Sequence, residues 1–246
     1  MAVDQAERVG MRFPTPSENR AARWAGWFMA ITFITSIPAL LLYHPILHDH
    51  NYILGAGHDT RIEFAAVLEV FLMISGIGVA VAMFPILRRQ NESLALGYVA
   101  SRIIEAAMIG VGILCLLAIV TLRGDLAGSV GGDSASLTTV GRSLVAIHEW
   151  TFLFGPGFAV GVNDILLGYL MYTTALMPQR LALFGLLGGP LIFAAKIAVV
   201  FGAFAINSSG AGILSIPVII FEASFAIYLI VWGFRPSRIL SGEPAA

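Results

Sequence analysis

Six long apolar segments, separated by short polar stretches, constrain the fold of this chain more than any other feature. The hydrocarbon core of a bilayer is about 30 Å thick, and about 20 helical residues cross it. Backbone polar groups find no water in that layer, so separate segments cross it as α-helices. The predicted spans are residues 24–43, 63–87, 94–122, 144–172, 181–206 and 213–234.

We therefore predict an all-α, polytopic integral membrane bundle of six transmembrane helices. The transmembrane domain is expected over 24–234, between a cytoplasmic N-terminal segment, 1–23, and a cytoplasmic C-terminal tail, 235–246. Only 12% of the residues are charged, against roughly 25% in a soluble domain, so the expected partner is the lipid bilayer. The formal net charge of -1 gives no sign of a nucleic-acid surface.

Basic residues between the spans predict the orientation, because cytoplasmic loops carry an excess of Lys and Arg. The poorer side carries Arg61, Arg123 and Arg142. The richer side carries Arg8, Arg12, Arg20, Arg23, Arg88, Arg89, Arg180, Arg235 and Arg238. Both termini are therefore expected in the cytoplasm, an N-in/C-in topology.

Ionisable groups inside spans are costly in lipid and generally face the bundle interior, where they bind or move ions and solutes. The binding or translocation candidates are Glu69, Tyr98, Arg102, Glu105, His148, Glu149, Lys196 and Glu222. Asp164 lies in the fourth span as well, but it is expected nearer the cytoplasm than these residues.

Two pairs of these candidates have compatible positions. Arg102 and Glu105 are three residues apart and share a helix face. Lys196 and Glu222 lie on consecutive spans at similar depth. Both pairs could serve only helix packing, but carboxylates outnumber the cations. The surplus carboxylates could be protonated, or could hold a metal or a translocated cation.

The fourth span contains Gly155, Pro156 and Gly157 in sequence. Proline removes a backbone donor, and the flanking glycines allow a bend, so we predict a helix break here. Broken helices at membrane depth often line an ion or substrate cavity. A simple packing kink is the alternative interpretation.

Histidines gather near the end of the first span, on the side opposite the termini. Imidazole binds zinc or copper. The weak metal candidates are therefore His44, His48 and His50 of this group, together with His148 at the outer end of the fourth span. Their spacing matches no familiar ligand pattern, and an exposed loop without a metal is the alternative. The identity of any cofactor stays unknown.

Two longer motifs stand out in the sequence. One comprises Phe84-Pro85, the stretch 91–98, and Arg102 with Glu105; the other runs from His148 to Phe152 with Gly-Pro-Gly. Both resemble motifs of a bacterial multi-pass membrane family known as domain of unknown function number 4386. Segments 217–222 and 233–237 are also similar. The resemblance implies six or seven helices in a bacterial cytoplasmic membrane and assigns no catalytic residue. Glu149 and His50 stand where Asp and Pro are commoner in that family.

Three functions fit these observations. The first is a transporter for a small solute, proton or cation that uses the intramembrane carboxylates. The second is a non-catalytic membrane sensor or assembly protein, which could form homo-oligomers. The third is an intramembrane enzyme, metal-assisted or not, acting on a lipid-like substrate. The chain lacks the metalloprotease, nucleophile-elbow and P-loop motifs, which favours a protein that is not an enzyme.

Overall fold

A computed structural model describes residues 11–55, 57, 59–125, 134–205 and 209–241. Within these ranges six helices are long and apolar enough to cross a membrane, which confirms the predicted class and number of spans. The long helices are α2 (Pro16–His48), α3 (Thr60–Leu87), α4 (Glu92–Asp125), α5 (Ser134–Phe152) continued by η2 (Leu153–Ala159) and α6 (Val160–Thr174), α7 (Gln179–Val200) and α9 (Ile216–Val231). The short ones are η1 (Tyr52–Leu54), α8 (Ser209–Leu214) and η3 (Arg238–Ser241).

Several helices differ in length from the predicted spans. α2 begins eight residues earlier, because Thr15 and Glu18 form a capping box that satisfies its first amides. α5 begins at Ser134, ten residues before the fourth predicted span, and residues 126–133 lie outside the described part. α7 ends at Val200, before the predicted end of the fifth span at residue 206, which is itself not described.

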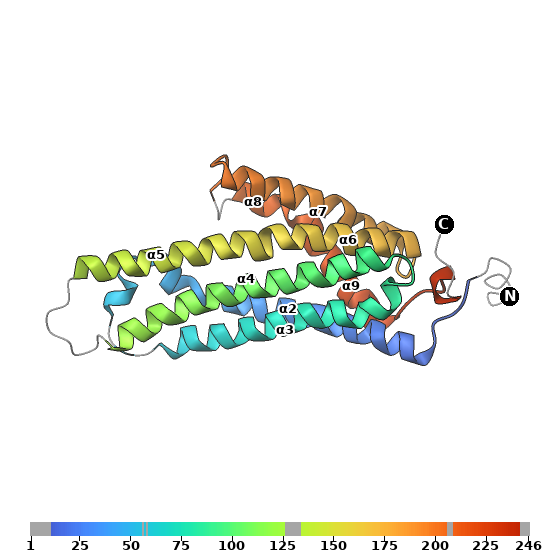
Figure 1. Ribbon diagram of the computed structural model, residues 1–246, viewed down its shortest axis with the longest axis horizontal. Helices are drawn as coiled ribbons and strands as arrows, with labels where there is room; N and C mark the ends of the chain where they lie inside the picture. The colour runs from blue at the N-terminus through green and yellow to red at the C-terminus, as the bar shows by residue number, and fades with distance from the viewer. Residues whose placement is uncertain (1–10, 56, 58, 126–133, 206–208, 242–246) are drawn as a thin grey trace.

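The six spans form a closed ring in chain order. Each packs against the next, α4 against both α5 and α6, and α9 returns to pack against α2. Figure 1 shows the helices aligned with the long axis, with the start of α2 and η3 at the same end of the bundle. There Arg12 and Ser237 form an isolated antiparallel bridge, and the Phe234 amide donates to the Asn19 side chain.

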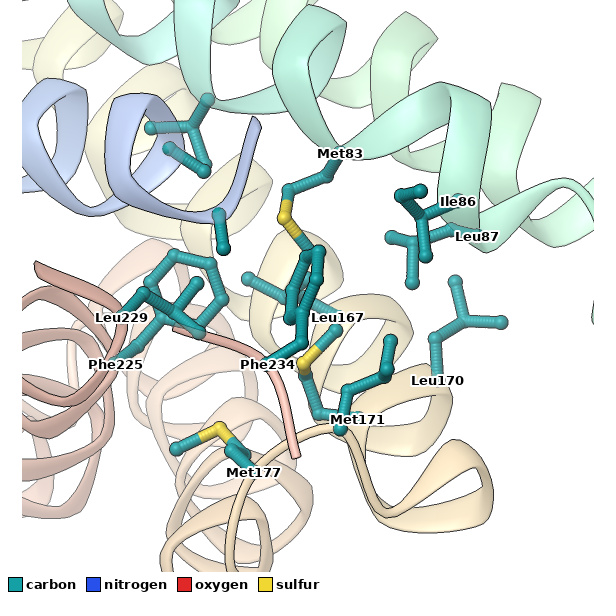
Figure 2. Packing of buried hydrophobic residues seen from close by; sticks show 14 of the residues in the cluster. Met83, Ile86, Leu87, Leu167, Leu170, Met171, Met177, Phe225, Leu229 and Phe234 are labelled. Carbon is teal, nitrogen blue, oxygen red and sulfur yellow. The ribbon is translucent and has the colours of Figure 1, made fainter. Parts of the chain in front are cut away.

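Two hydrophobic clusters occupy the ends of the bundle. The cluster near the termini includes Met83 of α3, Leu167 of α6, and Phe225 and Leu229 of α9, and Figure 2 shows their side chains gathered together. The other is built around Tyr43, Ile53, Ile62, Leu116 and Ile119. On α4 the first cluster ends at Tyr98 and the second begins at Leu116, and the stretch between them carries both polar residues and the small apolar cluster of Ile109 and Ile113 with Ala66.

Glycines bring α6 close to α7. A Cβ at Gly189 would lie 2.7 Å from the Gly161 carbonyl oxygen, and one at Gly168 would lie 2.9 Å from the Leu186 amide nitrogen. Small residues allow such backbone contact between membrane helices. α6 is thereby fixed against the ring, with its Asn163 and Asp164 buried.

Candidate functional site

Arg102 is the centre of a polar cluster about three turns after the start of α4. Only 3% of the residue is exposed. Its Nη1 donates to Glu105 Oε2 at 3.0 Å, as the spacing of the two residues predicted. Its Nε donates to the Tyr98 hydroxyl at 3.3 Å, one turn earlier on the same helix. The i, i+3 and i, i+4 geometry of a helix therefore places these three side chains together.

The third contact of Arg102 comes from another helix. Its Nη2 donates to Glu222 Oε1 of α9 at 3.1 Å. The predicted pairing of Glu222 with Lys196 is therefore wrong. The Lys196 side chain instead lies along η2, where a Cβ at Gly157 would meet its methylene groups at 3.3 Å. In the described part of the chain Lys196 has no ion-pair partner.

α6 adds two side chains that the sequence analysis did not select. Asn163 Nδ2 donates to Glu105 Oε2 at 2.7 Å. Asp164 is completely buried, and within the described residues neither of its carboxyl oxygens has a hydrogen-bond partner. The sequence feature that could have pointed to these two residues is the adjacent Asn-Asp pair inside an apolar run. Asn163 carries no charge, and Asp164 is not among the predicted candidates because it is expected nearer the cytoplasm than the others.

A second polar group lies further from the termini. The Tyr43 hydroxyl donates to Glu69 Oε2 at 3.1 Å. The Tyr43 ring contacts His148 edge-on, with ring centroids 5.9 Å apart. His148 is 6% exposed, and its Nδ1 lies against Gly112 without a hydrogen-bond partner among the described residues. An aromatic residue at a span end resembles an interfacial anchor, so Tyr43 was missed.

One cavity of about 250 Å³ joins the two polar groups. Such a volume holds several water molecules or a small solute. Its polar lining consists mainly of five predicted candidates, while Tyr98 contacts Arg102 from the side. The five are Glu69, Arg102, Glu105, His148 and Glu222. Glu149 does not line this cavity; it lines a separate hollow beside η1.

The predicted helix break takes a different form. α5, η2 and α6 run as one continuous helix, and the Gly-Pro-Gly sequence lies in the π-helical turns of η2. Pro156 borders the cavity. A Cβ at Gly155 would lie 2.8 Å from the Met108 Cβ, so the glycine lets η2 approach α4. π-helical turns often occur at functional sites.

The histidine candidates are spread over two helices and a turn. His44 and His48 stack with centroids 4.2 Å apart, and His48 Nδ1 is 2.9 Å from the His44 carbonyl oxygen. His50 is exposed. Across the described residues, no group of three or more His, Cys, Asp or Glu side chains has a geometry that could hold a metal ion.

Comparisons with other proteins locate the chain in one family. Neither the curated proteins nor the solved structures contain a match. The sequence profile described as Domain of unknown function (DUF4386) matches residues 24–233. This range includes every residue of the cavity lining named above. The chain therefore belongs to the DUF4386 family of multi-pass membrane proteins.

Proposed function

We propose that the protein transports a proton or a small cation through its intramembrane carboxyl groups. The observation that carries this proposal is the composition of the cavity, in which three carboxyl groups face a single guanidinium. Arg102 compensates at most one negative charge. A proton or a cation can balance the rest, and exchange of that ion with either side of the membrane constitutes transport.

We also propose that the protein lies in a bacterial cytoplasmic membrane with both termini in the cytoplasm. The excess of arginine on the side of the termini supports this orientation. The cavity is then separated from the cytoplasm by the hydrophobic cluster of Figure 2. A transported ion would have to pass this cluster during each cycle.

Flux through proteoliposomes tests the proposal. Vesicles that contain a pH-sensitive dye are given proton, sodium or potassium gradients, and Glu222→Gln is compared with the wild type. The amide oxygen of glutamine can still accept from Arg102, so the variant is expected to fold. Its flux is expected to fall at least tenfold. Glu92→Gln is the matched control, because Glu92 is exposed at the start of α4. Equal flux in wild type and Glu222→Gln would refute the assignment.

A purely structural role is the second candidate. It is favoured by the observation that Arg102 joins α4 to α9 with both guanidinium ends occupied. Under this alternative the double variant Arg102→Leu with Glu105→Leu folds and no gradient drives flux in the wild-type protein. The transport proposal predicts flux in the wild type and its loss in the double variant.

A further inference from the structure

The central cavity continues into a crevice between α2 and α5. A neighbouring hollow of about 360 Å³ shares Leu40, His148 and Phe152 with the cavity. A third hollow, of about 220 Å³, adjoins it at Leu47 and Glu149 and reaches η1. These adjoining hollows, here together termed the α2–α5 crevice, follow one another from the η1 end of the bundle to the central cavity.

The walls of this crevice are mainly apolar and open to the side of the bundle. Leu40 is 56% exposed, Leu41 is 65% exposed and Phe152 is 39% exposed. All three lie on membrane-spanning helices, where such side chains face acyl chains. The crevice therefore suits an apolar group that arrives from the lipid, rather than a hydrated ion.

The inner end of the crevice has the opposite character. Glu69 lies there, and its hydrogen-bond partner Tyr43 is neutral. Behind it are Glu105 and Glu222, which share Arg102 as their cation. His148 borders both hollows and is 94% buried. The polar end accordingly favours positive over negative charge.

We propose that the α2–α5 crevice binds an amphipathic organic cation, whose apolar part lies along Leu40 and Phe152 and whose charged group lies beside Glu69. This inference rests on the proposed transport of a cation and narrows the substrate, among small cations, to an organic one with an apolar part. A neutral amphiphile would leave the carboxyl groups without a counter-charge, and an anionic one would be repelled. Charge complementarity thus sets the selectivity, and the apolar walls supply much of the affinity.

Equilibrium dialysis against the full-length protein in zwitterionic lipid nanodiscs tests the site. The probes are octyltrimethylammonium, octyl sulfate and octanol, which share one chain and differ in charge. Empty nanodiscs correct for partition into lipid. The quaternary ammonium group cannot release a proton, so its binding reports charge alone. We expect it to bind at least tenfold more tightly than octanol, with octyl sulfate the weakest.

Two variants locate the site. Glu69→Gln is expected to weaken octyltrimethylammonium binding about tenfold and to leave octanol binding unchanged. Leu40→Trp is expected to fill the crevice and abolish the binding of all three probes. Ile34→Trp is its control, because Ile34 is a 63% exposed residue of the same helix that lines none of the three hollows. Circular dichroism checks that each variant folds.

Equal binding of the three probes, or unchanged binding in Leu40→Trp, would overturn the inference. Proton or metal-ion flux that depends on Glu222, without octyltrimethylammonium binding, would overturn the substrate class and leave the transport proposal intact. Selective binding without any flux would support the site and refute transport.

Discussion

At the scale of single residues, Arg102 determines where the polar groups of the interior lie. Its three nitrogens have three different acceptors, on Tyr98, Glu105 and Glu222. A guanidinium is planar and presents its donors in a fixed fork, whereas a lysine ammonium is a compact point charge. The positions of the two carboxylates are thus set by the shape of Arg102 as well as by its charge.

Arg102→Lys is therefore expected to destabilise the protein although the charge is kept. One ammonium group cannot reach all three acceptors, and a lost hydrogen bond to a charged group costs about 1.5–3 kcal/mol. Thermal unfolding in detergent measures the effect. Arg180→Lys is the control, since Arg180 is exposed. Equal unfolding midpoints in the two variants would argue against a shape requirement.

Substitution of Gly112 and of Gly97 by alanine, both on α4, is expected to change the stability of the protein in opposite directions. A Cβ at Gly112 would lie 2.9 Å from both His148 Nδ1 and Thr151 Oγ1, whereas a Cβ at Gly97 would have only Leu166 at 3.7 Å. Gly112→Ala should destabilise by about 1–3 kcal/mol through overpacking. Gly97→Ala should stabilise by about 0.5–1 kcal/mol, because glycine is a poor helix former. Thermal unfolding of both variants checks the signs.

The contacts inside one helix could be predicted from the sequence, and those between helices could not. The spacing of Arg102 and Glu105 fixes their relative positions once α4 is a helix. Sequence position gives the depth of a residue along the bundle, and by depth both Lys196 and Arg102 are possible partners for Glu222. It does not say which face of a helix meets which neighbour. The order of the helices in the ring does not say it either, because α9 packs against α7 and α2 while Arg102 of α4 reaches Glu222 across the interior of the bundle.

At the scale of elements, hydropathy located the helices but not their ends. It detects the part of a helix that lies in lipid, while α2 and α5 continue into polar sequence. The start of α2 depends on a side-chain cap, and the start of α5 lies in a stretch rich in Ser and Thr. The Gly-Pro-Gly sequence predicted a helix break at the position of η2. It did not predict the π-helical form of η2, which packs against α4 and α7.

The connection from α2 to α3 gives a prediction on pH. The hydroxyl of Tyr52, on η1, donates to Asp59, which caps α3, and the Arg123 guanidinium of α4 lies 4.5 Å from the Tyr52 ring centroid. Burial, together with the adjacent Asp59 carboxylate, raises the pKa of Tyr52 above its ordinary value of about 10. The folded state therefore holds this proton more tightly than the unfolded state does.

Stability from the Tyr52 contact is thus complete below pH 10 and decreases above it. Tyr52→Phe should unfold at a lower temperature than wild type at pH 8. At pH 11 ionisation of the unfolded state removes about 1.4 kcal/mol of the wild-type advantage. Calorimetry of both proteins at the two pH values checks this. A difference that does not change with pH would show that the hydroxyl contact is not formed.

At the scale of the whole molecule, the number of spans and the position of both ends at one end of the bundle followed from length and hydropathy. The six-membered ring and its cavity did not, because they depend on side-chain shape across helices far apart in sequence. Which end faces the cytoplasm is a property of the membrane, and the charge count is its only indication in the chain.

Cysteine labelling in intact cells tests that orientation. Cys115 is the single native cysteine and is buried, so Cys115→Ala is a suitable background. On this background His50→Cys is expected to react with a membrane-impermeant maleimide in intact cells. Ser93→Cys, on the side of the termini, is expected to react only after lysis. Both residues are exposed. The reverse pattern would invert the topology.

The joined chain ends have a mechanical consequence. The Arg12–Ser237 bridge, the Asn19–Phe234 contact and the bond from the Arg235 amide to the Leu176 carbonyl tie α2, α6 and α9 at one end. That end can serve as a fulcrum, and the 33 residues of α2 make a lever of about 50 Å. A rotation of about 5° at the fulcrum would move its far tip by about 4 Å and the middle by half as much. Small tilts near the termini are thereby magnified where the crevice opens.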